Sequence, residues 1–277
     1  NGHFYQKHVA KWLDIASYQL DAEFIATTGD NFYDNGIASV DDPYWISSYE
    51  AVYHQPHLFI NWHPVLGNHD YRGNWQAQID YSVKSRRWEM PAQYYSKTLA
   101  LDDGATALLL FIDTSPLNPD YAREAKYQEA YEQGASEQLS WINTMLAQDQ
   151  YTWKVVIGHH PLYSSGKRYG KTNAIKDVLE PVFHKHNVNL YIAGHEHDLQ
   201  HNQLAGDELV HVVSGGGSEV RPVGNYEFTQ FAKSTGGFVS VSMTAKSIFL
   251  NYIDHQGKKV YAHTINKPNT ASSSSTL

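Results

Sequence analysis

The chain has 277 residues, of which 42% are hydrophobic and 18% are charged, so it is long enough to bury a core and too apolar to be disordered. A formal net charge of -8, with no run of Lys or Arg longer than two residues, argues against a nucleic-acid-binding surface. No apolar run approaches the roughly 18 residues of a membrane-spanning helix. Because the chain has no cysteine, any bound metal must be held by nitrogen and oxygen atoms.

Apolar runs and three- or four-residue spacings divide most of the chain into strands and helices. In chain order the predicted elements are a helix at 1–20, a strand at 23–28, a helix at 42–53, a strand at 63–66, a helix at 77–86, a strand at 105–112, a helix at 137–146, a strand at 154–157, a helix at 173–186, strands at 188–193 and 208–213, and a hairpin of 237–243 with 247–253. This alternation predicts an α/β fold whose late strands form an antiparallel portion.

No linker interrupts residues 1–265, which we expect to form a single domain. The low-complexity Ser/Thr-rich tail at 266–277 is expected to be disordered. The segment at 118–134, rich in Tyr, Glu and Gln, is interpreted as a plain surface loop between a strand and a helix.

Five of the predicted strands end in polar residues, and glycine precedes them in four cases. The strand ends read TGDNFY (28–33), LGNHD (66–70), IDTS (112–115), IGHHP (157–161) and AGHEH (193–197). Ligands of layered α/β proteins bind outside the carboxyl ends of strands, because loops converge there. Imidazole and carboxylate donors suit Zn, Fe or Mn, and a carboxylate can bridge two ions about 3.5–4 Å apart that clamp a phosphate. The pattern therefore predicts a two-metal site.

The same motifs carry a family resemblance. The order Gly29-Asp30-x-x-Tyr33, Gly67-Asn68-His69-Asp70, Val156-x-x-His159 and Gly194-His195-x-His197 resembles the purple acid phosphatases among the calcineurin-like metallophosphoesterases, and most closely their small, tartrate-resistant, mammalian-type branch. The likeness continues in GNHDYRGNWQAQIDYSVKSRRWEMPAQYY, QLSWINTML and VSGGGSEV. It implies two mixed β-sheets packed as a sandwich and flanked by helices.

The resemblance also implies a role for each matching residue. It assigns a ferric ion to Asp30, Tyr33 and His197, and a divalent ion (Fe, Zn or Mn) to the bridging Asp30 with Asn68, His159 and His195. A metal-activated hydroxide would attack phosphorus, and Asn68 and His69 would contact the phosphate. His69 would also protonate the leaving alcohol. Asp70 either orients that imidazole or caps a turn.

Two departures from the family pattern bear on these roles. The family's first strand carries an Asp-x-Gly motif that has no counterpart here, and we expect it upstream of Asn1. If it is truly absent, the ferric site is incomplete, and a single-metal or catalytically silent protein follows. Arg168 stands about nine residues after His159, where the family often has a histidine, and we expect its guanidinium to bind phosphate. The alternative for Arg168 is a solvated basic loop, and His160 stays open.

The resemblance therefore implies an enzyme that hydrolyses phosphate monoesters at mildly acidic pH. Its substrates would be small phosphorylated compounds or phosphoproteins, in a secreted, periplasmic or lysosome-like compartment. A phosphodiesterase or a nucleotide pyrophosphohydrolase is the alternative with the same chemistry, since one fold supports all of these. A catalytically silent binding protein on the same scaffold is the alternative of another class.

Overall fold

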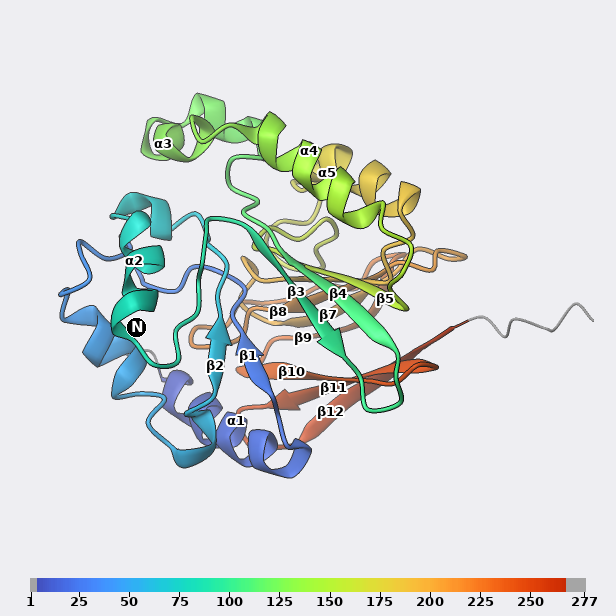
Figure 1. The fold of residues 1–277 in the computed structure, drawn as a ribbon, viewed down its shortest axis with the longest axis horizontal. Coiled ribbons are helices and arrows are strands. Elements are labelled where there is room, and N and C mark those ends of the chain that lie inside the picture. The colour runs from blue at the N-terminus through green and yellow to red at the C-terminus, as the bar shows by residue number, and fades with distance from the viewer. Residues whose placement is uncertain (1–3, 268–277) are drawn as a thin grey trace, which may run out of the picture.

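The computed structural model describes residues 4–267, and within them two layers of strands pack between helices (Figure 1). A seven-stranded mixed sheet has the order β3-β4-β5-β6-β8-β7-β9. The second layer consists of a parallel pair, β1-β2, and an antiparallel sheet, β10-β11-β12. Helices α4 and α5 lie over the outer side of the larger sheet, and α1 lies below the second layer (Figure 1). The expected α/β sandwich is confirmed.

The main elements have the following bounds. The strands are β1 (Phe24–Ala26), β2 (Asn61–His63), β3 (Tyr95–Ala100), β4 (Thr106–Phe111), β5 (Trp153–Ile157), β6 (Leu190–Ala193), β7 (Leu199–Asn202), β8 (Val210–Ser214), β9 (Thr229–Lys233), β10 (Gly237–Met243), β11 (Ser247–Asp254) and β12 (Lys259–Asn266). The helices are α1 (Gln6–Leu20), α2 (Gln76–Lys84), α3 (Gln128–Tyr131), α4 (Ala135–Leu146) and α5 (Asn173–Lys185).

The long helices and the parallel strands of the large sheet lie close to where the sequence predicts them. The helix expected at 42–53 is instead a short π-helix, Trp45–Glu50, and the strand expected at 63–66 ends at His63. Strands β3, β7, β9 and β12 were not predicted; β7 is buried at every position, whereas β3 and β12 each expose half of their residues. Strand β12 runs one residue beyond the expected domain end, and residues 268–277 of the expected tail lie outside the described residues.

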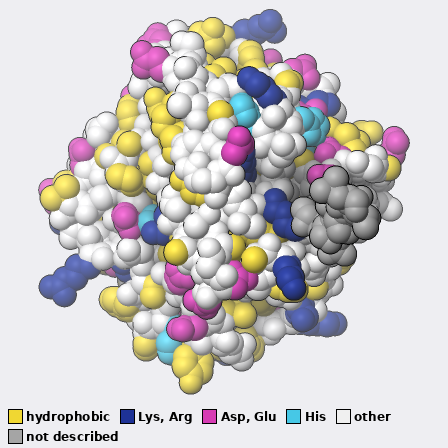
Figure 2. Space-filling view, turned by 45° about the vertical axis from the view of Figure 1, so that its right-hand side comes forward, with side chains coloured by type: hydrophobic (Ala, Val, Ile, Leu, Met, Phe, Trp, Pro, Cys, Tyr) yellow, Lys and Arg dark blue, Asp and Glu magenta, His cyan; other side chains and the backbone are white. Residues whose placement is uncertain are grey.

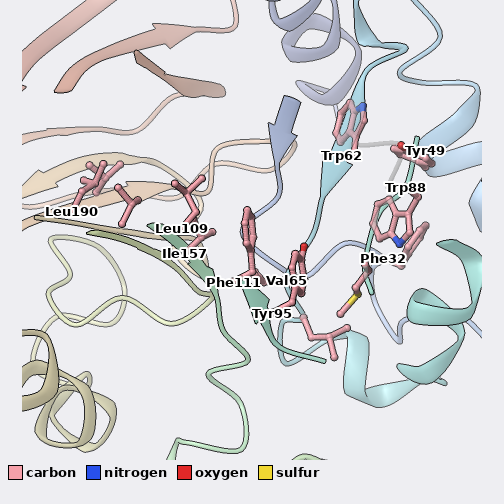
Figure 3. Packing of buried hydrophobic residues seen from close by; sticks show 14 of the residues in the cluster. Phe32, Tyr49, Trp62, Val65, Trp88, Tyr95, Leu109, Phe111, Ile157 and Leu190 are labelled. Atoms are coloured by element: carbon pink, nitrogen blue, oxygen red, sulfur yellow. The ribbon is translucent and has the colours of Figure 1, made fainter. Parts of the chain in front are cut away.

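Apolar side chains are buried on both faces of the large sheet. Strand β5 is buried at every position, as expected for a parallel strand covered on both faces. On one face Ile175, Leu179 and Phe183 of α5, spaced four residues apart, pack onto the sheet. On the other face an aromatic-rich core, including Phe111 and Trp62, joins the large sheet to β2 and its neighbours (Figure 3).

A cavity of about 750 Å³ divides the second layer. It is lined by β1 and β10, and it reaches Asp30, Tyr33 and His197 at one end. Among the described residues β1 pairs only with β2, and β10 only with β11. No strand of the described chain therefore crosses this cavity to link the two parts of the layer.

The interpretation of 118–134 as a plain surface loop is wrong. The segment folds into short helical turns, Pro119–Arg123 and Ala125–Tyr127, followed by α3. Its side chains Tyr121, Tyr127 and Ala130 are buried, because they pack down against the edge of the sheet that carries the polar strand ends.

Two observations concern the helices and the surface charge of the described residues. In the part of the chain that the structure covers, no helix is both long and apolar enough to cross a membrane. On the face shown in Figure 2, acidic and basic side chains are interspersed and no single charge dominates.

Candidate metal centre

The polar strand ends converge on one edge of the molecule, from both layers. Asp30 and Tyr33 follow β1, and Asn68 follows its parallel neighbour β2. His159 follows β5, and His195 follows the parallel β6. Since parallel neighbours end on the same side, each pair delivers its side chains together. The two layers are joined there by a hydrogen bond of 2.7 Å between His159 Nδ1 and the Thr28 carbonyl.

Glycine is required where the two loops of the second layer meet. A Cβ on Gly67 would lie 2.2 Å from the backbone nitrogen of Asp30 and 2.3 Å from its Oδ1. Gly29 has a φ of 84°, in the left-handed region that favours glycine. Asp30 and His195 have positive φ values of 54° and 64° without being glycines. The backbone is thus bent into uncommon conformations at two of the expected ligands.

Three expected ligands surround one ring nitrogen of a fourth, His159. The Nε2 atom of His159 lies 3.1 Å from Asn68 Oδ1 and 3.0 Å from His195 Nδ1. The same nitrogen lies 3.3 Å from Asp30 Oδ2. His159 donates its Nδ1 proton to the Thr28 carbonyl, because a carbonyl only accepts, and a neutral ring then has a lone pair on Nε2. Lone pairs that face one another at such distances are a fit for a cation.

The remaining expected ligands form the other half of the cluster. The Tyr33 hydroxyl donates to Asp30 Oδ2 at 2.7 Å and lies 3.1 Å from His197 Nε2. The other ring nitrogen of His197, Nδ1, lies 3.0 Å from Glu219 Oε2. A carboxylate behind a histidine orients its ring and raises its basicity as a ligand. Asp30 therefore touches both halves of the cluster.

The pKa shifts follow from burial and from the neighbouring charges. Burial alone would raise the pKa of Asp30, but His159, with His69 and His195, holds it well below its usual value. Burial raises the pKa of Tyr33, and the Asp30 carboxylate adds to this. Burial lowers the pKa of His195, and it lowers that of His197 to about 4 with help from Arg221. Neutral imidazoles and an ionised carboxylate are the forms that bind metals.

His69 lies at the open side of this cluster. Its Nδ1 donates to the Asp34 carbonyl at 2.7 Å, and its backbone nitrogen donates to Asp30 Oδ1 at 2.8 Å. Its ring centre lies 4.2 Å from that of Tyr33. The carbonyl of Asp34, not the carboxylate of Asp70, therefore orients the imidazole.

Two roles were expected for Asp70, orienting the His69 imidazole or capping a turn. The structure shows the second. Its buried carboxylate accepts hydrogen bonds from the backbone nitrogens of Gly67, Asn31 and Phe32, at 2.8, 3.1 and 3.2 Å. These bonds tie the loop after β2 to the loop after β1. Burial, with the charge of Asp30, raises the pKa of Asp70 to about 7.

Arg168 lies on a loop that hydrogen bonds to Glu196 hold in place. Glu196, which separates His195 from His197, accepts hydrogen bonds from the backbone nitrogens of Lys167 and Arg168. Burial lowers the pKa of His195 and of His160, and neighbouring charges, that of Arg168 among them, add to this. Its Nη1 atom is buried and has no hydrogen-bond partner among the described residues.

Several residues at the site were not predicted from the sequence. His160 is buried beside His159 and His195, and these three offer nitrogens within 4.8 Å of one another. Both of its nitrogens are engaged, by the Thr114 hydroxyl at 2.7 Å and the Tyr121 hydroxyl at 2.6 Å. The IDTS strand end therefore supports the histidines through Thr114. The motif VSGGGSEV contains Glu219, but the resemblance assigned it no role. No sequence signal pointed to Tyr127 or Arg221.

Comparisons with known proteins identify the family of this chain. The model of the calcineurin-like phosphoesterase family matches residues 3–199. The chain is 32% identical to purple acid phosphatase 4 of Arabidopsis thaliana, over 94% of this chain and 79% of the relative. It is 33% identical to tartrate-resistant acid phosphatase type 5 of Sus scrofa, over 91% of this chain and 78% of the relative.

A solved structure described as GAP50, the anchor in the inner membrane complex of Plasmodium, superposes with a TM-score of 0.81 at 24% identity, covering 97% of this chain and 86% of that one. At that identity the likeness concerns the fold alone. The family match and the two relatives together show that this chain belongs to the purple acid phosphatases, hydrolases of the calcineurin-like phosphoesterase family.

Proposed function

We propose that this metal-dependent phosphoesterase is a binuclear acid phosphatase that hydrolyses phosphate monoesters. Asp30, Tyr33 and His197 would hold a ferric ion, and Asp30 with Asn68, His159 and His195 would hold a divalent Fe, Zn or Mn ion. The observation that carries the proposal is the continuous set of contacts, none longer than 3.3 Å, through which Asp30 joins the two halves.

The donor types of the two halves fit different ions. A phenol and a carboxylate suit a hard trivalent ion, whereas an amide oxygen and two imidazoles leave the other ion divalent. When bound, such a pair lowers the pKa of water and offsets the charge of the phosphate. The protein's own residues then have to orient the ester and supply a proton.

His69 is proposed as the proton donor. With Nδ1 bound to the Asp34 carbonyl, its Nε2 is the nitrogen left for the substrate. Hydrolysis forms one P–O bond from the oxygen of water and breaks the ester P–O bond. The leaving oxygen takes its proton from Nε2 of the His69 imidazolium, which leaves the neutral imidazole, and the proton released by water restores the imidazolium.

Arg168 is proposed to bind the phosphate oxygens, with Asn68 and His69. Its buried and unpartnered Nη1 supports this role over that of a solvated loop residue. A guanidinium stays charged at any working pH and offers two parallel donors to an anion.

Comparison of two substrates on metal-loaded protein tests the proposal. We expect p-nitrophenyl phosphate to be hydrolysed faster than bis-p-nitrophenyl phosphate, and the iron-loaded protein to be purple from charge transfer between Tyr33 and iron. Faster turnover of the diester would favour the phosphodiesterase or pyrophosphohydrolase alternative. A colourless protein without iron or activity would favour the silent scaffold.

Substrate class and location belong to the same proposal. We infer small phosphorylated compounds or phosphoproteins as substrates, in a secreted, periplasmic or lysosome-like compartment. Antibody detection of the full-length protein in medium and cell fractions of its source tests the location, and recovery in the cytosolic fraction would contradict it.

A further inference from the structure

The segment at 119–131 touches the expected divalent half of the site through two stacked tyrosines. The ring centres of Tyr121 and Tyr127 lie 4.2 Å apart with their planes inclined by 28°, and both side chains are buried. Tyr121 contacts His160, which lies behind the ligands, whereas Tyr127 contacts the expected ligand Asn68 directly.

The Tyr127 hydroxyl receives two hydrogen bonds. The amide nitrogen Nδ2 of Asn68 donates to it at 2.7 Å, and Nη2 of Arg72 donates to it at 2.7 Å. Arginine can only donate, so the phenol oxygen must accept from it. An oxygen that already accepts from a guanidinium presents a strong, oriented acceptor to the Asn68 amide.

In the structure the Asn68 amide presents its nitrogen to Tyr127 and its oxygen to the other expected ligands. Its nitrogen is directed to Tyr127, so its oxygen Oδ1 is directed to the opposite side, 3.1 Å from His159 Nε2. Only the oxygen of an amide can bind a cation, because the nitrogen carries protons and no free lone pair. Asn68 is buried, with 2% of its surface exposed, and water is therefore a poor substitute for the phenol.

We propose that Tyr127 is a positioning residue that holds the Asn68 amide with its oxygen toward the divalent ion, and that Arg72 strengthens this hold. The proposal rests on the proposed function, since it assumes a divalent ion beside Asn68 and His159. It assigns the segment at 119–131 to the metal site of this chain.

The affinity of the divalent site for Zn²⁺ tests the proposal, by titration of the iron-loaded protein in competition with a chelator. In Tyr127→Phe we expect the affinity to fall about 10–100-fold, the usual effect of losing a residue behind a ligand. The iron content and the purple colour should be unchanged, since Tyr33 lies in the other half. Tyr131→Phe, an exposed tyrosine of the same segment, is the matched control and should match the wild type.

A second set of variants, built on Asn68→Asp, distinguishes orientation of the Asn68 amide from a general packing effect of Tyr127. Asn68→Asp replaces the amide by a carboxylate, which presents an acceptor oxygen whichever way it turns. Adding Tyr127→Phe to Asn68→Asp should then lower Zn²⁺ affinity less than about 3-fold. An equal fall in both backgrounds, or no fall in Tyr127→Phe alone, would overturn the role of Tyr127. Wild-type protein that binds no Zn²⁺ would overturn the proposed function as well.

Discussion

The two halves of the candidate metal centre are held in different ways. His159 and Asn68 are almost fully buried, and their positions are set by a backbone carbonyl and by Tyr127. His197, in the other half, is positioned by Glu219, whose side chain is 47% exposed. Both halves line the 750 Å³ cavity between β1 and β10, one with Tyr33 and His197 and the other with His159 and His195.

The two halves share the carboxylate of Asp30, but their other donors are positioned by different kinds of partner. Within the first half, His159 and Asn68 are organised before any ligand arrives, because they have internal partners and almost no access to water. In the other half His197 is also buried, but its partner Glu219 is exposed, and this half has fewer donors from the described residues. We therefore expect substitutions in one half to change one metal, and substitutions of the shared residue to change both.

The largest effect is expected at the shared residue. Asp30→Asn replaces the carboxylate that contacts both Tyr33 and His159, and we expect loss of both metals and a fall in kcat/KM of about 10³-fold or more. Metal analysis and p-nitrophenyl phosphate kinetics measure this. Asp14→Asn, in an ion pair with His57 elsewhere, is the control. Retention of either metal at full occupancy would break the view that Asp30 bridges the halves.

A loss of rate without loss of metal is expected at His69. We expect His69→Ala to lower kcat about 10²–10⁴-fold on an alkyl phosphate while both metals stay bound. The fall should be smaller on p-nitrophenyl phosphate, because nitrophenolate leaves without needing a proton. Equal falls on the two substrates would mean that His69 binds phosphate but does not protonate the leaving group.

A binding effect is expected at Arg168. Loss of a charge-assisted hydrogen bond costs about 1.5–3 kcal/mol, so Arg168→Ala should raise KM about 10–100-fold with little change in kcat. Arg168→Lys should give an intermediate KM, since it keeps the charge without the fork. If both kinetic constants equal those of the wild type, Arg168 is a solvated loop residue that does not bind phosphate.

The smallest effect is on stability and lies away from both halves. His211 in β8 is buried, neither ring nitrogen has a partner among the described residues, and burial lowers its pKa to about 3. Below about pH 6.5 the unfolded chain therefore binds a proton that the folded protein does not, and stability falls as pH falls toward 3.

Replacement of His211 should remove this part of the acid sensitivity. Between pH 7 and pH 4 we expect His211→Phe to lose on the order of 2–3 kcal/mol less unfolding free energy than the wild type. Urea unfolding at both pH values measures the difference, and the exposed His54→Phe is the control. An unchanged slope would place the acid sensitivity in the metal centre instead.

Local pattern predicted the elements whose residues are buried in a regular way. The helix α5 repeats apolar residues every four positions, and β5 is apolar at four of its five positions, so both were predicted within two residues. Strand β12 was not predicted, although four of its eight residues are apolar; it pairs with β11 in the antiparallel sheet. The buried tyrosines of 119–131 were not predicted either, because their partners are distant in sequence.

The sequence by itself determined the donor set and its order along the chain, because glycine followed by a polar residue at a strand end is a local signal. Tertiary structure alone decided which atoms face one another. That Tyr127 holds Asn68, that Asp34 holds His69 and that Glu196 holds the Arg168 loop depend on contacts between residues 28 to 59 positions apart. Such contacts arise from packing and hydrogen bonding between separate elements, which no local pattern records.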